Sequence, residues 1–248
     1  MFSLHAFSAS QATSTSLTNL AVLNDPAVSF SGNFLYVPSL FNLLGAYAGG
    51  ATLTRAQLQS PSLIAVSNYD VTPVNGALLP VDVLPMSLQI VSPVKLVADE
   101  ALQALVVNST NEVDHVFVWL SDGPVAPVAG EIRHVRATFT TSATGDAWQN
   151  ASITLDEALA KGNYQLVGAR AEGAHGVAFR FVFPGTSNSI RPGSLFRADS
   201  DANDIPGSRN GGWGVWGAFT NRVLPSVDHI TDGNTETAVL ILDIIKTE

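Results

Sequence analysis

The side chains that could carry out chemistry are few and scattered along the chain. No H-x-H or H-E-x-x-H pair occurs, so the metal chemistry typical of cupin-like barrels lacks its ligands. The sequence also has no G-x-S-x-G elbow, no phosphate-binding loop and no cysteine, which excludes a thiolate nucleophile, a thiolate zinc site and a disulfide. We therefore expect a protein that is not an enzyme. The five histidines are His5, His115, His134, His175 and His229.

Two of these histidines follow an aspartate, in Asp114-His115 and Asp228-His229. Neighbouring side chains of an extended segment point to opposite faces, so neither pair can act on one substrate. We expect all four to be surface residues.

Three carboxylates fall within six residues, at Asp199, Asp201 and Asp204. Hard cations such as Ca²⁺ prefer clustered oxygen ligands, but the segment lacks the glycine and the glutamate that an EF-hand loop has at its sixth and twelfth positions. A solvated acidic loop is the preferred interpretation, with Arg197 or Arg209 offsetting its charge. The alternative is Ca²⁺ held between subunits, and no other cofactor is expected.

The segment from Asn210 to Gly217 carries Trp213 and Trp216 among four glycines. One interpretation is an aromatic contact for a neighbouring subunit or a sugar. The other is a tightly turning segment whose indoles fill the core, with glycine allowing close backbone approach.

Composition narrows the function classes further. Lys and Arg number 12 and Asp and Glu 21, for a net charge of −9, which argues against the phosphate neutralisation that nucleic-acid binding needs. A hydrophobic content of 46% excludes a disordered chain. Apolar stretches are broken well before the roughly twenty residues of a membrane span, so no transmembrane helix is expected.

Short runs of β-branched and aromatic residues, separated by turn formers such as Asn-Gly and Asp-Gly, indicate an all-β sandwich or barrel. The predicted strands are Phe34–Val37, Leu63–Val66, Ala77–Leu84, Leu88–Val91, Ala104–Val107, Val116–Leu120, Val135–Phe139, Gln165–Ala169, Val177–Phe183, Val215–Phe219 and Ala238–Ile245.

Two capping boxes of the form T-x-x-[E/Q], at Thr54 to Gln57 and at Thr154 to Glu157, each predict the start of a short helix. They lie 100 residues apart, and an apolar strand follows each, so one β-domain plan used twice is a natural interpretation. The alternative is coincidence, because short apolar tetrads recur in any β-protein.

The predicted organisation has three parts. Residues 1–19, rich in Ser and Thr, are expected to form an N-terminal arm, or else an edge strand. Residues 20–122 are expected to form one β-sandwich and residues 123–248 another, with the boundary at the turn after Ser121.

Two successive β-sandwich plans in an acidic, cysteine-free chain, each with a capped helix, resemble the small form of the double jelly-roll major capsid proteins of tailless icosahedral viruses. The resemblance covers roughly residues 20–248 and is architectural. It implies two tandem jelly rolls with short capped helices, three chains in a pseudo-hexameric capsomer, and no catalytic residues. The first thirty residues lack the basic character that would favour anionic lipid, so membrane contact stays open.

From this resemblance we expect a structural virion protein, assembled in the host cytoplasm, whose partners are two further copies, neighbouring capsomers and minor capsid or vertex proteins, without direct nucleic-acid binding. A spike or minor capsid component is the nearest variant. The alternative of another class is a carbohydrate-binding β-sandwich that uses Trp213 and Trp216.

Overall fold

The structure is a computed structural model, and among the residues that it describes the regular elements are strands, apart from one short helix, α1 (Pro61–Val66). None of the helices it describes is long and apolar enough to cross a membrane. The residues described are 1–25, 27–36, 42–66, 68–71, 73–75, 93–145, 147–185, 190–197 and 208–247.

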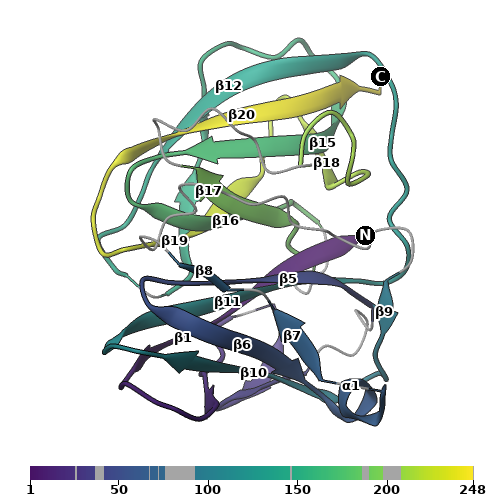
Figure 1. Cartoon of the computed structure of the whole chain (residues 1–248). Coiled ribbons are helices and arrows are strands. Elements are labelled where there is room, and N and C mark those ends of the chain that lie inside the picture. The colour runs from purple at the N-terminus through teal and green to yellow at the C-terminus, as the bar shows by residue number, and fades with distance from the viewer. Residues whose placement is uncertain are drawn as a thin grey trace.

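The first half of the chain forms a sandwich of two sheets (Figure 1). One sheet has the order β1 (Phe2–Gln11), β11 (Glu112–Ser121), β5 (Asn42–Gly50) and β8 (Pro73–Asn75), with β9 (Val94–Lys95) also paired to β5. The other has the order β3 (Ser29–Ser31), β4 (Phe34–Tyr36), β10 (Ala101–Asn108), β6 (Leu53–Gln59) and β7 (Tyr69–Val71), with β2 (Thr18–Asn19) also paired to β10.

The second half forms two sheets that join at one corner, because β17 pairs with both β16 and β15. One sheet contains β14 (Thr154–Leu155), β12 (Ile132–Thr140), β20 (Thr237–Lys246), β15 (Asn163–Glu172) and β18 (Gly217–Thr220). The other contains β13 (Gln149–Ser152), β19 (Ser226–Thr231), β16 (Gly176–Val182) and β17 (Gly193–Arg197).

Both halves use the same strand order. The order β1-β11-β5-β9 in the first corresponds to β12-β20-β15-β18 in the second, and β2-β10-β6-β7 corresponds to β13-β19-β16-β17, with antiparallel pairing throughout. In each half the first and last strands are adjacent and antiparallel in one sheet, and the strand after the first pairs with the strand before the last in the other sheet, which is the arrangement of a jelly roll. The predicted fold class, two tandem jelly rolls, is confirmed.

The repeat is not spaced as the sequence suggested. β5 begins at Asn42 and β15 at Asn163, 121 residues later, while β11 begins at Glu112 and β20 at Thr237, 125 residues later. The 100-residue offset between the capping boxes was therefore a coincidence.

Both predicted capped helices are wrong. Thr54 lies in β6, where its Oγ1 donates to Val107 O across the sheet at 3.0 Å, and Thr154 lies in β14. Cross-strand pairing of β6 with β10 overrides the local capping signal, because tertiary hydrogen bonds outweigh a helix preference in so short a segment.

The one helix, α1, contains Leu63, at the start of a predicted strand. Its amides are capped by Ser60 Oγ, which accepts from Leu63 N at 3.2 Å, and by the Glu100 carboxylate, which accepts from Ser62 N at 3.0 Å. The predictions at 77–84 and 88–91 lie outside the described residues, whereas those at 104–107, 116–120, 135–139, 165–169 and 238–245 fall within strands.

The N-terminal residues are not an arm. β1 pairs with β11 over ten residue pairs at the edge of its sheet, so the edge-strand alternative is the correct one. Its alternate side chains are buried on both faces: Phe2 and Leu4 belong to the core cluster of the second jelly roll, and Phe7 to that of the first. A Ser-rich sequence can be buried here because the strand lies between the two sandwiches.

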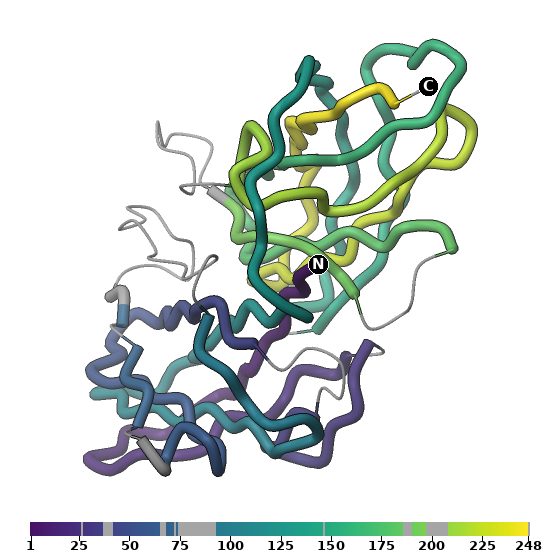
Figure 2. Tube along the Cα trace, turned by 90° about the vertical axis from the view of Figure 1, so that its right-hand side faces the viewer, coloured from purple at the N-terminus to yellow at the C-terminus, as the bar shows by residue number. Residues whose placement is uncertain are grey.

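The two jelly rolls stack in contact, with the β1-β11-β5 sheet of the first facing the second (Figures 1 and 2). The chain crosses between them in the segment after β11 and before β12. One hydrophobic cluster fills the first sandwich. The other fills the second sandwich and extends over the outer face of the β1-β11-β5 sheet through Tyr47, Phe117 and Trp119. The contact between the jelly rolls is thus part of a core.

Candidate functional site

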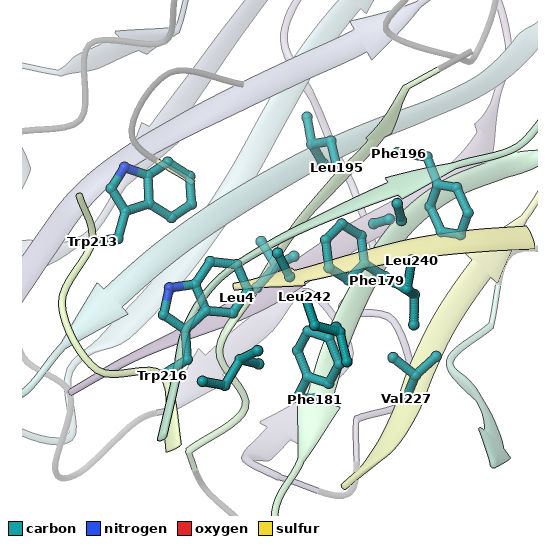
Figure 3. Packing of buried hydrophobic residues seen from close by; sticks show 14 of the residues in the cluster. Leu4, Phe179, Phe181, Leu195, Phe196, Trp213, Trp216, Val227, Leu240 and Leu242 are labelled. Atoms are coloured by element: carbon teal, nitrogen blue, oxygen red, sulfur yellow. The ribbon is translucent and has the colours of Figure 1, made fainter. Parts of the chain in front are cut away.

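The two tryptophans singled out in the sequence lie in the contact between the jelly rolls (Figure 3). Trp213 is 3% exposed and Trp216 1%, and their rings stack with centroids 6.1 Å apart. Phe2 meets both edge-on, at 5.8 and 5.3 Å, and Trp119 meets Trp213 at 6.2 Å. The expectation of an exposed indole surface is corrected: the rings fill the core, as the other interpretation held, and present no free face to a sugar.

Glycine is required where this segment turns. Gly211 and Gly214 have φ of +76° and +77°, which L-residues with side chains rarely adopt. A Cβ at Gly211 would lie 2.0 Å from Val128 O, and one at Gly214 would lie 2.9 Å from Ala126 O. The segment therefore packs its backbone directly against the connection between the jelly rolls.

Beside the aromatic rings lies a buried ionic group centred on Arg180 of β16. Its guanidinium donates two hydrogen bonds to the Asp25 carboxylate, at 2.5 and 2.8 Å, and one to Leu4 O at 3.1 Å. A third partner is Asp228, 3.1 Å from Nε, and the guanidinium lies 3.9 Å above the Trp148 ring. One side chain of the second jelly roll thus holds the first through the Asp25 carboxylate and the main-chain carbonyl of Leu4.

Arg191 adds a second cation to the same group. Its guanidinium donates to Asp228, and its main chain joins β1 through Arg191 N to Ser3 Oγ at 3.0 Å and Leu4 N to Arg191 O at 3.0 Å. Nearby, Trp119 Nε1 donates to Gly193 O at 3.0 Å. These bonds fix the positions of β1 and β11 against the second jelly roll.

The protonation states in this group follow from its contacts. Burial alone would raise the pKa of Asp25, but hydrogen bonds from His5 and Arg180 hold that pKa far below its usual range. Burial lowers the pKa of His5, against the opposing hydrogen bond from its Nδ1 to Asp25 at 3.0 Å. At neutral pH Asp25 is therefore a carboxylate and His5 a neutral imidazole.

The expectation that the two Asp-His pairs are surface residues is wrong. Asp114 is 0% exposed, His115 2%, Asp228 3% and His229 1%. His229 Nε2 accepts from Ser142 N at 2.9 Å, and burial lowers the pKa of His229. Burial also lowers the pKa of His115 to about 4, and its ring stacks on Phe117 at 5.8 Å. A short Asp-His signal does not reveal that both strands are covered on both faces.

Asp114 forms a carboxyl pair with Glu112, two residues earlier on the same face of β11. Burial, reinforced by the charge of Glu112 and a hydrogen bond to it, raises the pKa of Asp114 to about 7. A Cβ on Gly50 would lie 2.4 Å from Asp114 Oδ1, so glycine makes the room for this carboxyl group. Glu112 in turn accepts from Thr52 N at 2.8 Å.

The candidate metal ligands Asp199, Asp201 and Asp204 lie outside the described residues, as does the side chain of Arg197. Arg209 is described, and its Nε donates to Asp243 at 2.6 Å. Within the described ranges, no group of three or more His, Asp or Glu side chains could hold a metal ion.

Sequence reasoning missed the Arg180 group. One signal was present: Arg180 stands alone in the apolar run Val177–Phe183, and an arginine in a fully buried strand requires buried acceptors. Its partners Asp25 and Asp228 are 155 and 48 residues away, so no local pattern could identify them.

No protein-family model matches the chain, and no curated protein matches it. Among solved structures, the chain is similar to the crystal structure of the major capsid protein P2 from Bacteriophage PM2, with 12% identity and a TM-score of 0.27. The similarity covers 99% of this chain and 97% of that chain. At this TM-score the likeness carries no argument about function.

Proposed function

We propose that the chain is a structural protein of a viral shell, a major capsid protein that assembles as trimers into pseudo-hexameric capsomers of an icosahedral capsid. The observation that carries the proposal is the pair of jelly rolls with one strand order, joined by a continuous core. Three such chains present six similar sandwiches around an axis, which is the shape needed to tile a shell.

The contact between the jelly rolls supports this role. A tile must keep its shape, and the Arg180 group and the stacked tryptophans, all buried, fix one sandwich on the other. Removing one partner of a buried ion pair typically costs about 3–5 kcal/mol, so hinge motion between the halves would be strongly disfavoured.

Exposed apolar side chains supply surfaces for neighbouring copies. Phe30 and Phe34 of the β3–β4 hairpin are 42% and 39% exposed, and β3 is an edge strand of its sheet. Large side chains of this kind are enriched at protein interfaces. The carbohydrate-binding alternative has no such support, because the indoles it needs are buried.

Electron microscopy of the concentrated, purified protein tests the proposal. We expect three-fold particles with a pseudo-hexagonal outline, or closed shells built from them. Images that contain only single double-lobed particles under every condition of salt and concentration would overturn it.

A further inference from the structure

The far end of the second jelly roll carries two adjoining hollows of about 440 and 430 Å³. They share Asn163, which begins β15, and Thr220, which ends β18. The remaining lining residues are Lys161, Gly162, Tyr164, Gln165, Pro184, Ala218, Phe219, Asn221, Arg222, Val223 and Thr247.

The backbone around the hollows is held in place. Asn221 N donates to Gly162 O at 3.3 Å, and Gly162 N donates to Asn221 Oδ1 at 3.2 Å, so the two turns are tied together. Behind them, the rings of Tyr164 and Phe219 stack at 5.7 Å. The outer edge of β18 pairs with no described strand, and Val223 is 54% exposed. These features form a preformed, partly apolar surface.

The charge of this surface is opposite to that of the chain. None of the lining residues is Asp or Glu, although the chain has 21 of them and a net charge of −9. Lys161 and Arg222 form no ion pair with a described residue, and the exposed Lys246 sits opposite Tyr164 in the neighbouring strand. By contrast, seven other arginines are paired with carboxylates: Arg55, Arg133, Arg136, Arg170, Arg180, Arg191 and Arg209.

We propose that this basic hollow, defined by Lys161, Arg222 and Val223, is the contact site for an acidic surface of a second copy of the chain, an inference that rests on the proposed function. Charge complementarity favours this occupant. A basic area on an acidic molecule attracts the acidic surface of an identical molecule, whereas two such basic areas repel each other. Contact between two different surfaces of identical chains is head-to-tail and can close into a ring such as a trimer.

The turn from Val97 to Glu100 of the first jelly roll is the matching surface. Val97 is 65% exposed, and Asp99 is exposed and forms no ion pair within the part of the chain that the structure describes. The turn is held to α1, because Glu100 accepts from Ser62 N of this helix at 3.0 Å. An apolar side chain beside a free carboxylate complements an apolar side chain beside a free guanidinium. In Figure 1, α1 lies in the first jelly roll and β18 in the second, so the two surfaces are different, as a head-to-tail contact requires.

Charge reversal in the full-length protein tests the site, with assembly followed by sedimentation velocity over a series of protein concentrations. We expect Arg222→Glu to raise the concentration of half-assembly by about tenfold or more, and Lys161→Glu to act in the same direction. Arg55→Glu is the matched control, since Arg55 is 53% exposed and loses the same charge on a different face. It should change the midpoint by less than about twofold. Circular dichroism establishes that each variant is folded.

The partner surface is tested by restoring opposite charges, with Asp99→Arg placed in the Arg222→Glu background. Recovery of assembly to within about threefold of the wild type supports the pairing. Loss of assembly without such recovery overturns the assignment of the Val97–Glu100 turn. Unchanged assembly of Arg222→Glu overturns the hollow while leaving the capsid proposal intact, whereas a wild-type protein that never assembles overturns the capsid proposal itself.

Discussion

Each jelly roll buries an aspartate on its last strand, and the pKa values of the two are shifted in opposite directions. Asp114 on β11 points into the first sandwich beside Glu112, and its pKa is raised to about 7. Asp243 on β20 points away from the second sandwich and lies beneath the segment that carries Arg209. Although burial opposes it, hydrogen bonds from Arg209, Asn210 N and His134 hold the pKa of Asp243 below its usual range.

Both carboxylates occupy space left by a glycine of the strand that pairs with the last strand, β5 in the first jelly roll and β15 in the second. A Cβ on Gly50 would lie 2.4 Å from Asp114, and one on Gly168 would lie 2.8 Å from Asp243. The backbone setting is thus similar, and the difference comes from what covers the carboxylate. A loop over the outer face of a sheet can bring an arginine, whereas the interior of a sandwich leaves the carboxyl group to be neutralised by a proton.

In the contact between the jelly rolls, as at Asp243, an arginine neutralises buried carboxylates, because Arg180 pairs with Asp25 and Asp228. Arg180→Met leaves both carboxylates buried without their main partner, so we expect a loss of about 3–5 kcal/mol in the free energy of unfolding. Urea denaturation at neutral pH measures this loss. Arg55→Met, at an exposed pair, should cost less than about 0.5 kcal/mol. Equal effects of the two changes would contradict the role given to Arg180.

Asp243→Asn keeps the size of the side chain and removes its charge. We expect a loss of about 2–3 kcal/mol at neutral pH, because Arg209 loses its charged acceptor. Since the folded pKa of Asp243 is lowered, its contribution is present above the ordinary carboxyl range and is lost as pH falls through the folded value. The variant and the wild type should therefore converge in acid. A constant difference from neutral to strongly acidic pH would show that charge is not the cause.

Asp114→Asn should raise the free energy of unfolding, whereas Asp243→Asn lowers it. Because the folded pKa is raised to about 7 from 3.8, the wild type loses stability as pH rises between these values. We expect the variant to gain about 1–3 kcal/mol at pH about 8 and almost nothing at pH about 4. Thermal unfolding at both pH values measures this, and destabilisation at the higher pH would overturn the proton-held carboxyl pair.

Phe30→Ser tests the smallest effect on the fold. Phe30 is 42% exposed, so its loss should change the free energy of unfolding by no more than about 0.5 kcal/mol. Assembly, measured by light scattering, should nevertheless weaken if the β3–β4 hairpin contacts a neighbouring copy. A variant that unfolds more easily would place this side chain in the core of the first sandwich instead.

The fold class could be predicted because it depends on local sequence patterns. Alternating apolar runs such as Val135–Phe139 and turn formers between them required only neighbouring residues to interpret. The failures have one cause. Thr54 and Phe2 lie in strands whose partners are about 50 and 120 residues away, and those pairings decide against the local signals of a helix and an arm.

The candidate site was less predictable for the same reason. Sequence spacing identified Trp213 and Trp216 as unusual, but it could not show that their rings are buried. The rings that cover them belong to Phe2 and Trp119 of the other jelly roll. The basic hollow is likewise assembled from three separate turns and carries no motif. Composition did supply one useful clue, the scarcity of cations in the chain, against which two cations at one hollow, Lys161 and Arg222, stand out.

Mass photometry of the purified full-length chain, from dilute to concentrated protein and at low and high salt, tests the capsid proposal most directly. The proposal predicts a particle of three times the mass of the chain, followed by larger assemblies as concentration rises. A single species with the mass of one chain under all of these conditions would contradict it.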